Sequence, residues 1–147
     1  MARLDLRLFI RATPDRVWQI ISDIPGQQRW MVDLHRLHIT SDARSGIGTE
    51  MDVTSELFGL PVVKDRMSIT SWQPPYRFDV QHKGSFSGTG SFMLDPVPAG
   101  TVFTWIEDFK PPAGPLGELG FSLVIGPHLR RVFRRSMDNV RRLAEGA

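Results

Sequence analysis

The C-terminal stretch, residues 127–145, constrains the fold of this chain more than any other feature. Its apolar or small side chains recur at steps of three and four residues, the spacing of one helix face. These residues are Leu129, Val132, Phe133, Ser136, Met137, Val140, Leu143 and Ala144. Six arginines lie on the flanks and on the opposite side, at positions 130, 131, 134, 135, 141 and 142. A long amphipathic helix of this kind has to bury its apolar stripe against another element of the fold.

The element that can receive this helix is a sheet predicted from the preceding sequence. Residues 34–109 form six short runs in which apolar and polar side chains alternate, and residues 4–10 form another. Turns rich in glycine and proline separate most of them, so the neighbouring strands should be antiparallel. The pattern predicts seven antiparallel strands whose apolar faces pack on the C-terminal helix.

Three stretches outside this pattern predict helices or loops. Thr13 is suited to cap a short helix that begins at Pro14, and residues 27–34 indicate a second helical turn. After Phe109 we expect a loop and then a helical piece over residues 116–125, interrupted at Gly126-Pro127 before the last helix. Pro111, Pro112 and residues 114–120 favour a mobile gate over a cavity mouth.

Composition narrows the class of protein. The 147 residues fit one domain, residues 1–147, and the absence of cysteine excludes disulfides and thiol chemistry. The net charge of +2 depends largely on the C-terminal helix, so we expect no nucleic-acid partner. The N-terminus carries no signal-peptide pattern, and no apolar run approaches the length of a membrane span. We expect a cytoplasmic protein, a monomer or homodimer, with no metal or other cofactor.

Strand phase and the helix stripe together predict which side chains lie between sheet and helix. They are aromatic, methionine and valine residues, which suit an irregular apolar ligand. The predicted ligand-binding residues are Met51, Met67, Phe78, Phe92, Phe103, Trp105, Phe133, Met137 and Val140. The alternative is that these side chains pack on each other as a solid core.

Three polar residues share the apolar phase of their strands, namely Glu107, His82 and Asp65. A carboxylate on a buried face is costly unless it is paired or protonated. We therefore treat all three as candidate catalytic or ligand-anchoring groups, with Glu107 and His82 able to act as an acid–base pair. A β-bulge could instead turn any of them outward, Glu107 could lie at the rim, and Asp65 could pair with an internal arginine.

Three segments resemble a known family: "ATPDRVWQIISDIPGQQRW", "GSFSGTGSFMLDPVPAGTVFTWIEDFK" and "LRRVFRRSMDNVRRLAE". Together with the strand order they resemble the START-related (SRPBCC) helix-grip superfamily, in its polyketide cyclase/dehydrase-like and lipid-transfer branch. The resemblance implies an α+β fold in which a curved seven-stranded antiparallel sheet wraps around the C-terminal helix. Two short helices would lie between the first and second strands, and the gap would hold a hydrophobic ligand.

Two functions follow from this resemblance. The first is binding or transport of a small hydrophobic molecule such as a lipid, quinone or polyketide. The second is a polyketide cyclase/dehydrase-type enzyme that uses inward acid–base residues. The arginines of the last helix either form a solvated outer face or attract an anionic membrane surface transiently.

Overall fold

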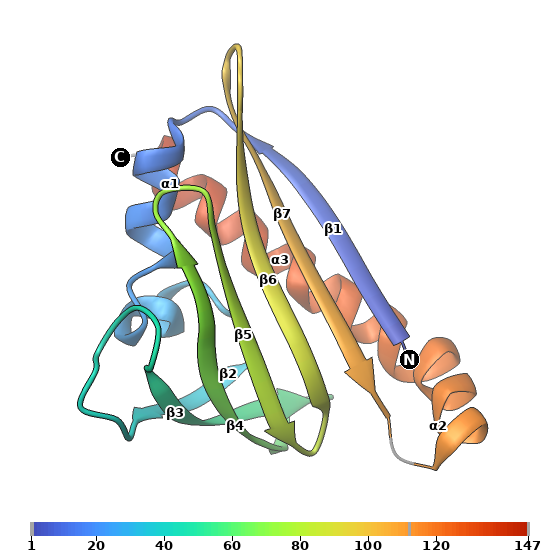
Figure 1. Ribbon diagram of the computed structural model, residues 1–147. Coiled ribbons are helices and arrows are strands. Elements are labelled where there is room, and N and C mark those ends of the chain that lie inside the picture. Colours follow the sequence, from blue (N-terminus) through green and yellow to red (C-terminus); the bar gives the residue numbers. More distant parts are fainter. Residues whose placement is uncertain (1, 112, 147) are drawn as a thin grey trace.

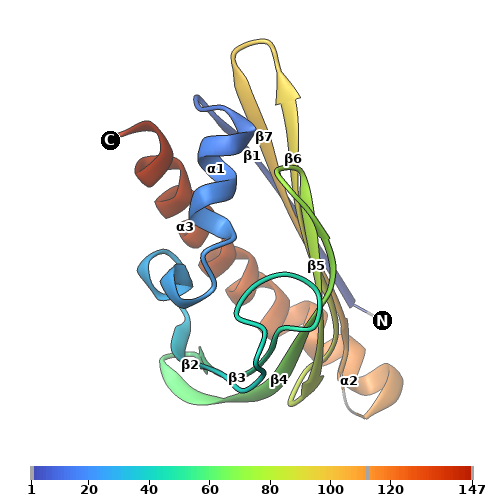
Figure 2. The ribbon, with the colours of Figure 1, turned by 60° about the vertical axis from the view of Figure 1, so that its left-hand side comes forward.

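The computed structural model describes residues 2–111 and 113–146. One antiparallel sheet with the strand order β1-β7-β6-β5-β4-β3-β2 carries α1, η1 and α3 on one face, and α2 extends beyond the end of β7 (Figures 1 and 2). The strands are β1 (Ala2–Ile10), β2 (Leu34–Ile39), β3 (Glu50–Leu57), β4 (Leu60–Gln73), β5 (Arg77–Gly84), β6 (Ser87–Val97) and β7 (Gly100–Lys110). The helices are α1 (Pro14–Ile21), the 3₁₀ turn η1 (Pro25–Arg29), α2 (Gly114–Gly120), the π turn η2 (Phe121–Ile125) and α3 (Gly126–Glu145). The predicted α+β architecture, with its seven strands and two short helices between β1 and β2, is confirmed.

The sheet is strongly curved. Its pairing register shifts within β2–β3, β3–β4 and β4–β5, and such bulges bend a strand and increase its twist. Figure 2 shows the result: β5, β6 and β7 stand nearly upright beside α3, whereas β2, β3 and β4 curl beneath it. The gap between sheet and helix is therefore closed from below by the sheet itself.

The long C-terminal helix differs from the sequence prediction at one point. We expected an interruption at Gly126-Pro127, but α2, η2 and α3 follow one another without a break from Gly114 to Glu145. Proline lacks an N–H and clashes with the carbonyl of a regular α-helical turn. The π turn widens the helix here, and the Gly126 N–H bonds to the Phe121 carbonyl five residues back. This wider turn accommodates Pro127 without ending the helix.

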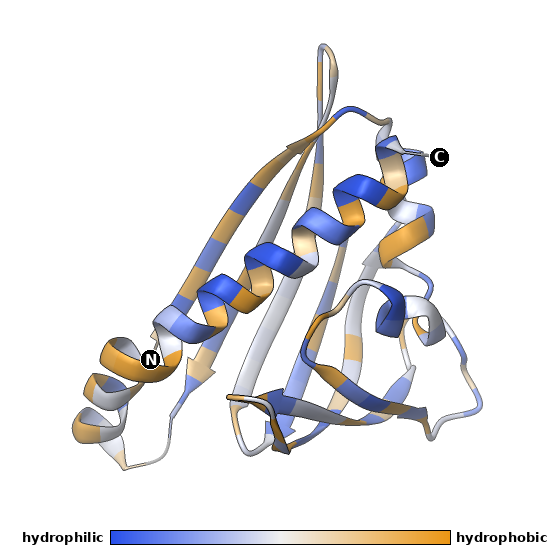
Figure 3. Ribbon diagram, turned by 180° about the vertical axis from the view of Figure 1, so that it is seen from behind, coloured by the Kyte–Doolittle hydropathy of each residue, from blue (hydrophilic) through white to orange (hydrophobic). Residues whose placement is uncertain are grey.

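The helices are held by specific caps and contacts. The Thr13 hydroxyl accepts a hydrogen bond from the Arg16 N–H at 3.3 Å, which confirms the predicted cap of α1. Ser136, fully buried on α3, accepts a hydrogen bond from the Val32 N–H at 2.9 Å. This bond ties the segment between η1 and β2 to the helix. The buried residues of α3 are mostly apolar. Figure 3 shows that hydrophilic residues alternate with these along the helix.

One half of the space between sheet and helix is solid. There α1 packs against α3, and Trp18 contacts Trp72 and Phe78 edge-on, with ring centroids 5.0 and 5.7 Å apart. Phe103 and Val140 are fully buried. The other half, beyond the reach of α1, lies between the curled strands and the first turns of α3. Among the described residues, no helix has the length and apolarity to cross a lipid bilayer.

Candidate functional site

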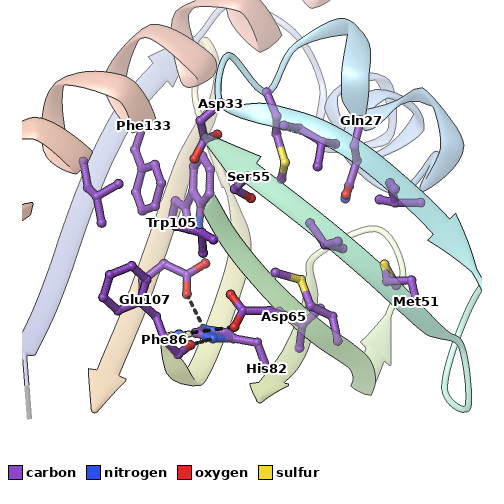
Figure 4. Close-up of a pocket in the computed structure, with 18 of the residues that line it drawn as sticks. Gln27, Asp33, Met51, Ser55, Asp65, His82, Phe86, Trp105, Glu107 and Phe133 are labelled. Atoms are coloured by element: carbon purple, nitrogen blue, oxygen red, sulfur yellow. Dashed lines mark hydrogen bonds and ion pairs between the residues drawn. The ribbon is translucent and has the colours of Figure 1, made fainter. Parts of the chain in front are cut away.

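A cavity lies in the half of the molecule that α1 does not fill (Figure 4). The volume open to the centres of water-sized spheres is about 100 Å³, several times what a single water needs. Strands β3 to β7 and helix α3 supply most of its apolar wall. These side chains are Met51, Val53, Val63, Met67, Val80, Phe92, Trp105, Phe109, Leu129 and Phe133. The segment around η1 and the start of β2 closes the remaining side with Ile24, Met31, Leu34 and Leu37.

Five of the nine predicted contact residues line this cavity: Met51, Met67, Phe92, Trp105 and Phe133. Among them, the Trp105 and Phe133 rings stack almost in parallel, with centroids 4.2 Å apart. This stack joins β7 to α3 across the gap.

The other four predicted contact residues do not line it: Phe78, Phe103, Met137 and Val140. They lie on the predicted inner faces, at most 1% exposed, but in the solid half of the interior. Phe78 is in contact with Trp18 of α1 there. Strand phase predicts which face of the sheet a side chain occupies. It does not predict where along the strand the solid core ends and the cavity begins. The four residues are therefore part of the core.

All three polar candidates line the cavity, and two of them form a buried pair. His82 Nε2 on β5 lies 3.0 Å from Glu107 Oε2 on β7. The other carboxylate oxygen of Glu107 accepts a hydrogen bond from the Trp105 indole N–H at 2.9 Å. His82 Nδ1 lies against the Phe86 carbonyl, which can only accept, so Nδ1 carries a proton. The ring is thus held between a backbone carbonyl and a carboxylate.

Two glycines of β6 explain why side chains from β5 and β7 can meet. Strand β6 runs between them, with Gly90 opposite Glu107 and Gly88 opposite His82. Neither glycine places a side chain on the inner face. A Cβ at Gly90 would come within 2.6 Å of Glu107 Oε1, closer than any normal contact. The Glu107 carboxylate therefore occupies the space over Gly90 that a side chain would otherwise fill.

Charges and burial shift the proton affinities of this group. Burial alone would lower the pKa of His82, but the hydrogen bond and charge of Glu107 raise it above its ordinary value, with help from the Phe86 carbonyl and Asp65. Burial raises the pKa of Asp65, against the backbone N–H of Phe86, which donates to Asp65 Oδ1 at 3.2 Å. Asp65 therefore bonds to the backbone of the β5–β6 turn rather than to an internal arginine.

Sequence reasoning missed the remaining polar residues of the cavity wall, which are Gln27, Ser55, Glu56 and Asp33. Among these four, Asp33 is the acid whose pKa is raised. It lies in the turn between η1 and β2, where no periodicity indicates which way a side chain points. Figure 4 shows its carboxyl group on the same side of the cavity as Trp105 and Ser55. Burial, together with the charges of Glu107 and Glu56, raises the pKa of Asp33 to about 6. The apolar setting of this acid, in "WMVDL", was the only signal in the sequence.

The described part of the segment predicted to form a mobile gate does not lie at the cavity. Residues 114–120 are helical, as α2, and none of them lines the cavity; Pro111 does not line it either. Pro112 lies outside the described residues. Within residues 2–111 and 113–146, no group of three or more His, Asp or Glu side chains is arranged to hold a metal ion.

The arrangement defines a class of protein: a curved sheet gripping a helix, with a mainly apolar cavity that contains a histidine–carboxylate pair. The family model described as "Polyketide cyclase / dehydrase and lipid transport" matches residues 1–145. The chain belongs to this family. A search of curated proteins found no match.

Solved structures share the fold at low sequence identity. TTHA0849 from Thermus thermophilus is 17% identical, with a TM-score of 0.81 and 97% of each chain covered. Protein BH1534 from Bacillus halodurans is 17% identical, with a TM-score of 0.72 and coverage of 99% and 98%. The Aha1 dimer from Colwellia psychrerythraea is 15% identical, with a TM-score of 0.68 and coverage of 99% and 97%. At these identities the likeness concerns the fold alone.

Proposed function

We propose that this protein binds a small, mainly apolar molecule in the cavity between the curled sheet and α3. The observation that carries the proposal is the hollow itself, which mainly apolar side chains line together with a few polar groups. Apolar pockets with a few convergent polar groups are typical ligand sites. Apolar walls would supply most of the affinity, and the polar cluster would orient the ligand.

Native mass spectrometry of the freshly purified protein tests this proposal. We expect a bound small molecule in the wild type and its loss in Val53→Trp, because Val53 is 5% exposed and lines the cavity. Val62→Trp is the matched control, since Val62 lies on the neighbouring strand β4 and is 55% exposed. A molecule retained equally by both variants would place its binding site elsewhere.

Catalysis is a second candidate function, favoured by the His82–Glu107 pair. An acid–base enzyme needs at least two polar groups near one reacting atom of the ligand, and these two side chains approach within 3.0 Å on the cavity wall. Asp33, with its pKa near 6, has a proton affinity suited to transfer near neutral pH. In this reading a carboxylate of the wall takes a proton from the carbon next to a ligand carbonyl, and protonated His82 gives a proton to the hydroxyl on the following carbon. The C–O bond then breaks, a C=C bond forms, and water leaves.

Comparing the molecules bound to the wild type and to Glu107→Gln separates the two functions. A dehydrating enzyme should release or hold a product lighter by one water, while the variant keeps the unreacted molecule. A carrier should hold the same molecule in both proteins. The same molecule in both proteins, after incubation at saturating concentration, would rule out the catalytic candidate.

The surface of the C-terminal helix supports transient contact with an anionic membrane as a source of the ligand. Leu116, Leu119 and Leu123 on α2 and η2 are 79%, 56% and 69% exposed, and exposed arginines follow on α3. Apolar and basic side chains on one helix are typical of interfacial binding. Sedimentation with anionic vesicles should capture the protein at low salt, and Leu119→Asp should weaken capture. Equal capture by zwitterionic vesicles would contradict the electrostatic part of this proposal.

A further inference from the structure

The charges around the cavity are strongly one-sided. Four carboxyl groups line it, those of Asp33, Glu56, Asp65 and Glu107. The only basic side chain in its described wall is His82, and neither lysine nor arginine is found there. Even with His82 protonated, the wall therefore carries an excess of negative charge. The chain as a whole has a net charge of +2, so the sign inside the cavity is opposite to that of the molecule.

The hydrogen-bond donors of the polar cluster are already engaged. The Trp105 indole N–H donates to Glu107, and the two nitrogens of His82 face Glu107 and the Phe86 carbonyl. The Phe86 N–H donates to Asp65. Across the cavity, the side-chain nitrogen of Gln27 donates to the Ile21 carbonyl. A ligand that needs donors would have to break one of these bonds or rely on the Ser55 hydroxyl and the second N–H of Gln27.

Acceptors, in contrast, remain available. A carboxylate offers about four acceptor positions. Glu107 uses two of them, for His82 and Trp105. Asp65 is bound only by backbone N–H groups at the β5–β6 turn. The Asp33 carboxyl has a hydrogen bond from its own backbone N–H. All three carboxyl groups can therefore accept a further hydrogen bond from a ligand.

We infer that the cavity selects apolar ligands that carry a hydrogen-bond donor, cationic or neutral, and rejects ligands that end in a free carboxylate. This inference rests on the proposed binding function and specifies its ligand class as apolar amines and alcohols rather than fatty acids. Repulsion between a ligand carboxylate and four wall carboxyl groups is stronger beside a mainly apolar wall than in bulk water. An ammonium or hydroxyl group can instead donate a hydrogen bond to the unoccupied acceptor positions of these carboxyl groups.

Calorimetric titration of the full chain with octylamine, octan-1-ol and octanoate at pH 8 tests the inference. The three probes share one alkyl chain and differ in the charge of the head group. We expect octylamine and octan-1-ol to bind, and octanoate to bind at least about tenfold more weakly. The net positive charge of the protein would favour octanoate, so the opposite order has to come from the cavity.

Two variants assign the selectivity to named groups. Asp33→Asn and Asp65→Asn should each reduce the preference for octylamine over octanoate by several fold, and Asp95→Asn, at an exposed position of β6, should leave it unchanged. Octanoate binding as tightly as octylamine would overturn the inference and leave the binding function standing. No binding of any of the three probes would count against the binding function itself.

Discussion

Asp33 should weaken the fold at neutral pH, and replacing it with asparagine should therefore stabilise the protein. Its pKa rises from 3.8 in the unfolded chain to about 6 in the folded protein. Each unit between the two values corresponds to 1.36 kcal/mol, so the difference amounts to about 3 kcal/mol. Asp33 is only half-buried, and solvent contact reduces this figure. We expect Asp33→Asn to raise the free energy of unfolding at pH 8 by about 2 kcal/mol.

The sign of this effect depends on pH. Because the folded pKa of Asp33 is the higher one, the folded state holds the proton more tightly, and stability is lost as the pH rises from 3.8 through about 6. Asparagine does not titrate, so the gain should fall to about 0.5 kcal/mol at pH 4, where Asp33 is almost fully protonated in the folded state and already partly protonated in the unfolded chain.

Urea unfolding followed by tryptophan fluorescence at pH 4 and pH 8 measures both values. Asp95→Asn serves as the matched control, because Asp95 is exposed and does not line the cavity; it should change stability little at either pH. At pH 8 the gain for Asp33→Asn corresponds to a rise in Tm of roughly 4–8 °C for a chain of this size. A variant no more stable than the wild type at pH 8, or equally stabilised at both pH values, would refute the reasoning.

Three further changes test the polar cluster and its supports. Gly90→Ala places a Cβ 2.6 Å from Glu107 Oε1 and should cost about 1–2 kcal/mol of stability by urea unfolding; an unchanged midpoint would show that the carboxylate moves freely. Glu107→Gln should lower the pKa of His82 in an NMR titration. In the wild type the raised pKa of His82 stabilises the fold fully below pH 6.5, and this stabilisation should disappear as the pH rises through the raised pKa. Glu107→Gln lacks this contribution, so its stability should not show the same pH dependence. Ser136→Ala leaves the Val32 N–H without its acceptor and should cost about 1–3 kcal/mol; hydrogen exchange at Val32 should accelerate, and unchanged exchange would contradict the tie.

Local patterns were enough to predict the sheet and the inward-facing polar groups. Period-two alternation identifies the buried face of each strand, and it placed Glu107, His82 and Asp65 on the side where they are found. The glycines in "SGTGSF" are a second local signal, because a glycine inside a strand indicates a bulge or a close approach. In the structure Gly90 gives the Glu107 carboxylate its space. These features depend on residues in the same strand or in the adjacent hydrogen-bonded strand, so a local sequence pattern is enough to indicate them.

The extent of the cavity could not be predicted in this way. Phe78 and Val140 have the same phase as the residues of the cavity wall, and only the position of α1 along the sheet puts them in the solid core. Asp33 lies in a turn, where no period applies. Pro127 predicts a helix break in isolation, but the π turn that accommodates it begins at Phe121, whose side chain is packed into the core. Each of these features is set by contacts between distant segments.

An NMR titration of the isotopically labelled protein with octan-1-ol tests the central claim most directly. If the cavity admits an apolar molecule, saturable shifts should concentrate on the wall, at residues such as Met51, Val80 and Phe133, and Val53→Trp should abolish them. Val62→Trp should behave like the wild type. Shifts confined to exposed residues, or the same wall shifts in Val53→Trp, would contradict a binding site between the sheet and α3.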